Sequence, residues 1–143
     1  MTSGMLDTSV VIDWHDPNVV RALPDELAIS AITAAELAAG PHVAATAGEA
    51  AKRQLRLQEV ESKLDPIPFD GAAVRSYGLV VAAIIGDGRT ARGRFADLLI
   101  AASAHANGLD LYTRNGDNFR GTDHLVHVVQ ICGNPTHLSP ACR

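Results

Sequence analysis

Four acidic residues stand where the chain is predicted to leave a strand or to enter a helix. Asp7 and Asp117 each follow a short apolar segment typical of a strand, and Glu36 and Asp97 are each predicted in the first turn of a helix. The carboxyl ends of parallel strands meet at one edge of a sheet, so we expect these four carboxylates to converge in one acidic pocket.

A pocket of several carboxylates favours a bound cation, because crowded carboxylates repel one another and their pKa values rise when no cation is present. Mg²⁺ and Mn²⁺ are hard cations that take such oxygen ligands. One or two of these ions can polarise a phosphodiester, convert water to hydroxide and stabilise the leaving oxygen. The pattern therefore predicts metal-assisted hydrolysis of a phosphate ester, with nucleic acid as the favoured substrate.

Each acid also has a purely structural explanation. Asp7 suits the N-cap of the helix that follows it. Thr33 and Glu36 have the spacing of a capping box, and Asp97 suits the positive end of a helix dipole. Asp117 lies in a sequence typical of a turn. These explanations account for each residue singly, but not for the placement of all four at one edge of the sheet.

Positive charge is concentrated next to two of the acids. Arg89, Arg92 and Arg94 precede Asp97 in a Gly- and Arg-rich loop, and Arg114 lies close to the fourth acid. The alternative is a loop that only aids solubility, but the clustering favours contacts with backbone phosphates.

A second group of cations, Lys52, Arg53 and Arg56, lies on a long predicted helix. These residues are typical of an ordinary solvated helix face, so we assign them no part in the site.

Strands and helices are expected to alternate along the chain, which is typical of a parallel α/β sheet covered on both faces. Short strands are predicted at 4–6, 27–32, 109–113 and 126–131, with an extended segment at 67–69. Helices are predicted at 9–14, from Asp16-Pro17 onward, and at 33–39, 43–64, 70–85 and 95–107.

Length and composition limit the classes of protein. A chain of 143 residues predicts a single domain over 1–143, with a core at about 5–131 and a loosely ordered tail at 132–143. Apolar residues make up 47%, which excludes a disordered chain. The net charge of −4 excludes a histone-like nucleic-acid binder, and the aromatic content of 4% disfavours an aromatic base-stacking platform.

No targeting segment is predicted, because the N-terminus has no basic region and Asp7 and Asp13 interrupt its apolar stretch. No membrane segment is predicted, because the longest apolar run, 79–85, is too short to cross a bilayer. Cys132 and Cys142 do not form a disulfide framework, although the two residues have the option to pair or stay free. A cytoplasmic protein is expected.

Other enzyme classes fit less well. A haloacid-dehalogenase-like phosphatase needs a second Asp two residues after the first, and position 9 is Ser. The glycine and lysine pattern of a P-loop is absent. His124, His127 and Cys132 have metal-ligating side chains, but surface positions are the favoured interpretation of the two histidines.

Four short motifs occur in order along the chain: Met5-Leu6-Asp7-Thr8-Ser9, Thr33-Ala34-Ala35-Glu36-Leu37, Phe95-Ala96-Asp97-Leu98-Leu99-Ile100-Ala101 and Thr113-Arg114-Asn115. Together they resemble the acidic motifs of PIN-domain nucleases, and within that family the VapC-type toxins of bacterial toxin–antitoxin pairs. The resemblance covers about 5–131, nearly the whole chain.

The resemblance implies a three-layer α/β/α sandwich with a short-stranded parallel sheet and an acidic Mg²⁺ site, with Mn²⁺ as a substitute. It implies an endoribonuclease that cuts single-stranded or loop RNA, such as tRNA or rRNA, and blocks translation. It also implies a homodimer, a VapB-type antitoxin as partner, and contact with promoter DNA only through that antitoxin.

Residue by residue, the resemblance implies that Asp7 and Asp97 are the principal metal ligands, with Glu36 and Asp117 acting through water. Arg89, Arg92, Arg94 and Arg114 would bind substrate. Supporting roles fall to Thr8, Ser9, Thr113 and Asn115. The alternative function is a PIN-like module that binds RNA or a partner without cutting.

Overall fold

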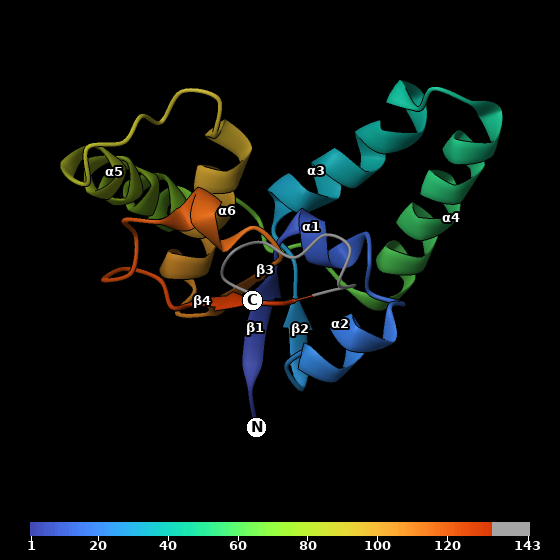
Figure 1. Cartoon of the computed structure of the whole chain (residues 1–143), viewed down its shortest axis with the longest axis horizontal. Helices are drawn as coiled ribbons and strands as arrows, with labels where there is room; N and C mark the ends of the chain where they lie inside the picture. Colours follow the sequence, from blue (N-terminus) through green and yellow to red (C-terminus); the bar gives the residue numbers. More distant parts are fainter. Residues whose placement is uncertain (133–143) are drawn as a thin grey trace.

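Four parallel strands form one sheet in the order β2-β1-β3-β4 (Figure 1). The computed structural model describes residues 1–132 of the chain. The strands are β1 (Ser3–Leu6), β2 (Glu26–Ala28), β3 (Asp110–Thr113) and β4 (Val128–Gln130). Because β1 lies between β2 and β3, its carboxyl end is at the centre of the sheet edge where a site is expected.

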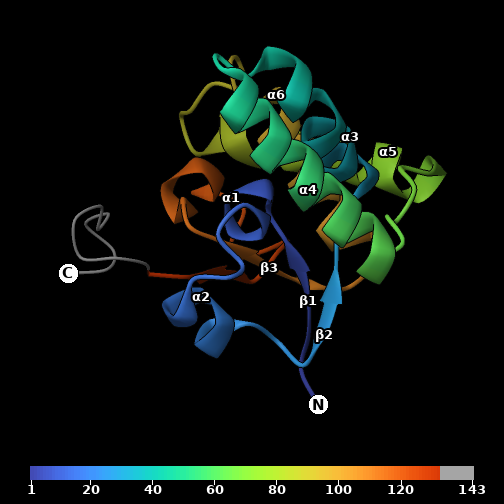
Figure 2. The same ribbon diagram turned by 90° about the vertical axis from the view of Figure 1, so that its right-hand side faces the viewer.

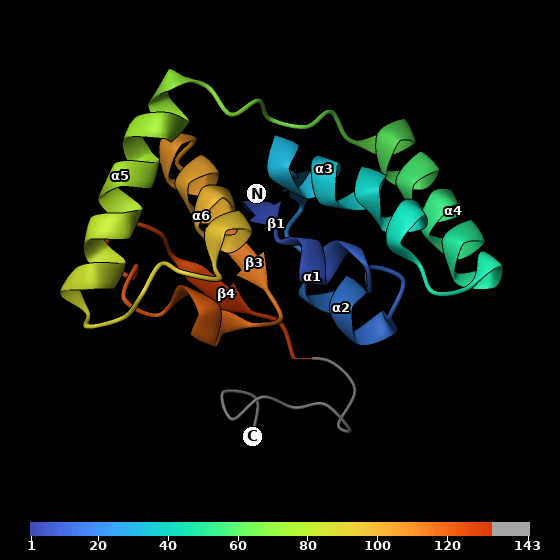
Figure 3. The same ribbon diagram turned by 90° about the horizontal axis from the view of Figure 1, so that it is seen from above.

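Helices cover both faces of this sheet. They are α1 (Thr8–Val11), α2 (Pro17–Ala22), α3 (Ala31–Ala39), α4 (Ala47–Lys63), α5 (Gly71–Gly86) and α6 (Phe95–Ala106), with 3₁₀ helices η1 (Gly40–Val43) and η2 (Gly116–Phe119). Figures 1 and 3 show α5 and α6 on one side of the molecule and α3 with α4 on the other. Figure 2 shows α1 and α3 near the ends toward which β1 and β2 point. The predicted α/β sandwich is confirmed.

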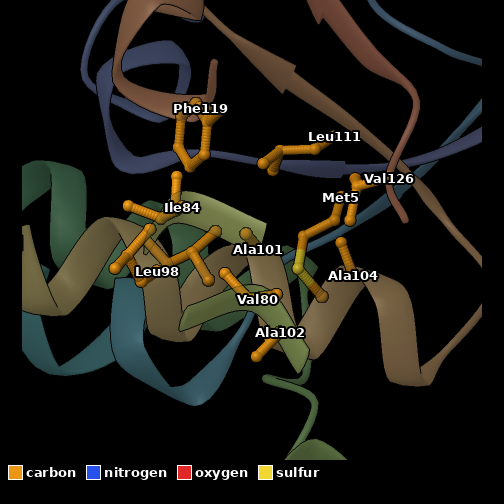
Figure 4. Close-up of a cluster of buried hydrophobic side chains, with 11 residues drawn as sticks. Met5, Val80, Ile84, Leu98, Ala101, Ala102, Ala104, Leu111, Phe119 and Val126 are labelled. Atoms are coloured by element: carbon orange, nitrogen blue, oxygen red, sulfur yellow. The ribbon is translucent and has the colours of Figure 1, made fainter. Parts of the chain in front are cut away.

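Two apolar clusters bind the layers together. Met5 and Leu111 pack on one face of the sheet against α5 and α6, where Leu98 is fully buried (Figure 4). Leu6 and Tyr112 belong to the cluster on the opposite face. This alternation along β1 and β3 is the period of two that a strand imposes, and it explains why both faces of so short a sheet are apolar.

One close approach within the sheet requires glycine. A Cβ atom built on Gly4 would lie 2.3 Å from Cε1 of Tyr112. The absence of a side chain in β1 therefore makes room for the Tyr112 ring of the neighbouring strand.

The second predicted strand is shorter than expected, and the helix after it begins earlier. Ser30 is the N-cap of α3, and its Oγ accepts a hydrogen bond of 3.1 Å from the Thr33 backbone N–H. The capping box predicted from Thr33 to Glu36 is therefore wrong, since Ser30 occupies the cap. Glu36 lies in the second turn of α3, not in the first.

Two other predicted boundaries also move. The helix predicted at 43–64 begins only at Ala47, because η1 intervenes and Thr46 provides the N-cap. The helix predicted at 9–14 ends at Val11 and continues as turns. Asp16 and Asp70 cap α2 and α5 as expected. The remaining strands and helices lie within a few residues of their predicted ranges.

Residues 1–132 contain no helix with the length and apolar character needed to cross a membrane. The predicted tail lies outside the described residues apart from Cys132, and so does Cys142.

Candidate active site

Asp7 lies at the end of β1 and is the N-cap of α1, with only 3% of its surface exposed. Its Oδ1 accepts a hydrogen bond of 2.8 Å from the Thr8 backbone N–H. Its Oδ2 accepts bonds of 2.8 Å from Ser9 Oγ and from Thr113 Oγ1. A carboxylate has about four lone-pair positions, so these three donors leave one position for a further partner. Asp7 can therefore cap α1 and bind a further partner at the same time.

Glu36 is connected to the same corner through Thr8. The Thr8 hydroxyl donates a hydrogen bond of 2.7 Å to Glu36 Oε1, and Thr33 Oγ1 lies 3.1 Å from the same Thr8 oxygen. A hydroxyl has one proton, so Thr8 donates to the carboxylate and accepts from Thr33. This chain of bonds joins α1 to α3 and fixes the direction of Glu36.

Asp97 lies in the first turn of α6 and is half-buried. Burial raises its pKa from the ordinary 3.8 to about 6, with further contributions from the negative charges of Asp7 and Glu36. The Arg94 guanidinium and a hydrogen bond with Asn118 lower the pKa and oppose this shift. The structure thus brings together three of the four predicted acids, from residues that lie far apart in the sequence.

The fourth acid, Asp117, has a different environment. Its side chain is 62% exposed, and its Oδ1 lies 3.7 Å from Arg120 Nη2. The neighbouring Asn118 is the residue of η2 that contacts Asp97. Asn118 was not among the predicted site residues, and its only signal in the sequence is its position in the turn after β3.

The predicted supporting residues converge on Asp7. Besides its bond to Asp7, Ser9 Oγ accepts a bond of 3.1 Å from the Arg114 backbone N–H. The Asn115 backbone N–H donates a bond of 3.0 Å to Thr113 Oγ1. Asn115 therefore takes part through its main chain, and the two hydroxyls tie the turn after β3 to the start of α1.

Three of the four arginines predicted to bind substrate are engaged with the protein itself. Arg89 Nη1 donates to the carbonyl oxygen of Asp117 at 2.9 Å, and Arg94 Nη1 donates to that of Asn118 at 3.2 Å. Arg114 forms an ion pair with Asp13. Arg92 is exposed, and its guanidinium makes no hydrogen bond or ion pair within residues 1–132. The contacts of Arg89 and Arg94 hold the turn that carries Asn118. Among the four arginines, only Arg92 has no side-chain partner within residues 1–132.

The second cationic group was interpreted as a solvated face, and this is wrong for two of its members. Arg53 and Arg56 are only partly exposed and line a hollow of about 370 Å³. The hollow is also lined by Thr8 and Glu36, so it adjoins the acidic site. Lys52 is exposed, as predicted.

The side chains of the site fit a hard cation, because they offer carboxylate and hydroxyl oxygens as metal ligands. Burial is the main cause of the raised pKa of Asp97, and the negative charges of Asp7 and Glu36 add a smaller contribution that a cation would offset. No group of three or more His, Cys, Asp and Glu side chains within residues 1–132 is arranged to enclose a metal ion. A cation here would therefore take one or two carboxylates from the protein and its other ligands from water, as Mg²⁺ often does.

A family model described as PIN domain matches residues 4–125. This chain belongs to the PIN domain family. Ribonuclease VapC5 of Mycobacterium tuberculosis is 33% identical over 128 residues, which cover 88% of this chain and 92% of that relative. The predicted relationship to VapC-type proteins is confirmed.

Solved structures give the same relationship. A member of the VapBC family of toxin-antitoxin systems, VapBC-5 from M. tuberculosis, matches this PIN domain with a TM-score of 0.77 and 33% identity, covering 92% of this chain and 98% of that one. FitAcB from Neisseria gonorrhoeae matches with a TM-score of 0.67 and 27% identity, covering 94% and 99%.

Proposed function

We propose that this PIN domain is the toxin of a VapBC-type pair and acts as a metal-dependent endoribonuclease. The observation that carries the proposal is the convergence of Asp7, Glu36 and Asp97 at the carboxyl end of the central strand. The names of its relatives support it, since one is a ribonuclease and another comes from a toxin–antitoxin complex.

Asp7 and Asp97 would hold Mg²⁺, or Mn²⁺ in its place, with Glu36 and the exposed Asp117 acting through water. A bound divalent ion would polarise the phosphodiester and lower the pKa of water. The carboxylates themselves must be ionised to bind it, which gives the pKa of Asp97 a direct influence on activity.

The other residues of the site keep these carboxylates in position. Ser9 and Thr113 hold Asp7, and Thr8 holds Glu36. Asn118 donates to the ionised form of Asp97 and thereby favours it. Preorganised ligands of this kind avoid reorganisation when substrate binds.

The proposed substrate is single-stranded or loop RNA, with tRNA or rRNA as the target whose loss blocks translation in the cytoplasm. We assign the positioning of a phosphate to Arg92, the loop arginine without a protein partner in the described part of the chain. The net charge of −4 disfavours broad electrostatic binding of duplex DNA, so promoter DNA would be contacted only through an antitoxin.

The proposed partners are a VapB-type antitoxin and a second copy of this chain. The toxin–antitoxin complexes among the similar structures support the first. Exposed apolar side chains on α5 and at the start of α6 support the second, since a homodimer would cover them. They include Leu79, Ile85 and Phe95.

The test is cleavage of total cellular RNA by purified, antitoxin-free protein with Mg²⁺, Mn²⁺ or EDTA. We expect discrete fragments that require metal and disappear with Asp7→Asn. Asp65→Asn is the matched control, because Asp65 is exposed and lies between α4 and α5. A folded, metal-binding protein that cuts no RNA would instead favour the binding module without turnover.

A further inference from the structure

The hollow beside the acidic site, here called the α4 hollow, contains one cationic side chain that has no partner among residues 1–132. Its walls come from α1, α3, η1 and α4, and Thr8 and Glu36 stand at the junction with the acidic site. At about 370 Å³ it has the size of cavities that take small ligands.

Most charges around the α4 hollow are paired. Arg53 Nε lies 3.3 Å from Glu49 Oε1, and Arg53 Nη1 donates to the Gly40 carbonyl oxygen at 2.9 Å. The Asp13 carboxylate pairs with Arg114. These contacts fix Arg53 and neutralise two of the acids.

Arg56 is the exception. Its side chain is partly buried in the wall of the hollow, yet it has no hydrogen bond or ion pair within residues 1–132. A guanidinium that loses water without gaining a partner is unfavourable, and a bound anion would remove that cost. Its planar fork of donors matches the oxygens of a phosphate.

The position of Arg56 suits a chain of phosphates that leaves the acidic site. On the α6 side of the site, Arg89 and Arg94 hold the main chain, and Arg92 is the loop arginine without a partner among residues 1–132. On the α4 side, Arg56 is available. Two exposed apolar side chains, Ile12 and Val43, line the same hollow, and 73% of Val43 is exposed. Apolar surface beside a free cation is the combination that a nucleotide needs for its base and its phosphate.

A second hollow continues beyond Arg56. It has a volume of about 290 Å³ and shares Ile12 and Arg56 with the first, while Lys52 adds another cation. A path with cations at successive positions fits a polymer with repeated negative charges better than it fits a single small molecule.

We propose that the α4 hollow is a subsite for a nucleotide that flanks the scissile bond, in which Arg56 binds its phosphate and Ile12 and Val43 contact its base. The proposal rests on the proposed ribonuclease function and adds the direction in which the RNA strand lies. It also gives α4 a role in substrate binding that its sequence did not indicate.

The first test measures the binding of a short, mixed-sequence single-stranded RNA to full-length protein by fluorescence anisotropy. Asp7→Asn is the background that prevents cleavage. Arg56→Gln should weaken binding by about tenfold. It should also lower the slope of log affinity against log salt by about 0.7, the value for one phosphate contact on a single strand. Arg56→Lys should restore most of the salt slope.

Arg75→Gln is the matched control. Arg75 is an exposed residue of α5, on the other side of the molecule, and the substitution removes the same charge. Equal losses for Arg56→Gln and Arg75→Gln would show a general effect of net charge and overturn the subsite.

The second test locates the phosphate. Neutral methylphosphonate linkages are placed one at a time along an RNA that the wild-type protein cuts. One linkage next to the cut should weaken binding to the protein with Arg56, and the same linkage should have no effect with Arg56→Gln. If the neutral linkage and Arg56→Gln weaken binding independently at every position, so that their effects add, Arg56 contacts none of these phosphates and its assignment is wrong.

Failure of this inference is distinct from failure of the proposed function. If the wild-type protein cuts no RNA, the ribonuclease proposal fails, and the subsite fails with it. If it cuts RNA but Arg56→Gln binds RNA normally, only the subsite fails. Loss of antitoxin binding by Arg56→Gln with unchanged RNA binding would identify the α4 hollow as a protein-binding groove instead.

Discussion

The Thr113 hydroxyl donates a hydrogen bond of 2.8 Å to Oδ2 of Asp7, across a separation of 106 residues in the sequence. Both side chains are buried, and each stands at the carboxyl end of its strand. The bond therefore joins the ends of β1 and β3 at the point where the acidic site begins.

Replacement of Thr113 by Val should preserve its volume while removing this donor. We expect a loss of about 2 kcal/mol in the free energy of unfolding, because a buried carboxylate loses a hydrogen bond. RNA cleavage should fall by about tenfold, because the direction of the Asp7 carboxylate is no longer fixed. Denaturant unfolding and a cleavage assay on the same samples measure both effects.

Ser76→Ala is the control for this substitution. Ser76 is also buried, but its hydroxyl bonds to His105 between α5 and α6, away from the site. This variant should lose about 1 kcal/mol of stability and keep its cleavage rate. Equal loss of cleavage in both variants would show that stability alone limits the activity.

The pKa of Asp97 predicts a pH dependence of stability in the metal-free protein. The folded-state pKa, about 6, lies above the ordinary value of 3.8, so the folded protein binds the additional proton. The resulting stabilisation is complete below the ordinary pKa and is lost as the pH rises through about 6. Asp97→Asn should remove this dependence and stabilise the metal-free protein at pH 7 by about 1 kcal/mol, after allowance for partial exposure to solvent.

Thermal unfolding in EDTA from pH 4 to pH 7 measures this effect, with Asp65→Asn as the control that should follow the wild type. Added Mg²⁺ should raise the melting temperature of the wild type at pH 7 more than that of Asp97→Asn. Parallel pH curves for wild type and Asp97→Asn would contradict the raised pKa.

The contrast between Asp117 and Asn118 gives a third prediction. Asn118 contacts Asp97, whereas the Asp117 side chain is exposed beside Arg120. Asn118→Ala should therefore reduce cleavage more than Asp117→Asn, and the reduction should be larger near pH 6, because Asp97 loses a donor that favours its ionised form. A pH–rate profile of the two variants measures this difference. A larger loss of cleavage for Asp117→Asn than for Asn118→Ala would identify Asp117 as the fourth acid of the site and contradict the prediction.

The loop arginines should separate into two groups. Arg92→Ala should weaken RNA binding and reduce its salt dependence, because the exposed guanidinium has no partner in the described part of the chain and can contact phosphate. Arg94→Ala should instead shift the acidic limb of the pH–rate profile upward, since the Arg94 charge lowers the pKa of Asp97. Binding titrations at several salt concentrations and a pH profile would test this division, which identical behaviour of the two variants would contradict.

The sequence predicted well those features that depend only on a few neighbouring residues. Apolar strands ending at Asp7 and Thr113, and the cap at Asp70, lie close to their predicted positions because they depend on neighbouring residues. The convergence of Asp7 and Asp97 was also predictable, since parallel strands align their carboxyl ends and a helix starts at the same edge.

Contacts between segments were not predictable in the same way. Two residues suit a cap before α3, Ser30 and Thr33, and only packing decides between them. Arg56 was assigned to a solvated face because most residues of this helix are polar or charged, but α3 and η1 fold against α4 and enclose one side of it. Asn118 contacts Asp97 only through tertiary packing of η2 on α6.

The central position of β1 in the sheet has a consequence for the chain during its own synthesis. β1 is made before its neighbour β3, which ends only at Thr113. Asp7 receives its bond from Thr113, and Asp97 and Asn118 come from the same late part of the chain. A nascent chain therefore has no complete acidic site until the segment through Asn118 has followed β1 out of the ribosomal tunnel, so assembly of the site is a late event in the synthesis of this fold.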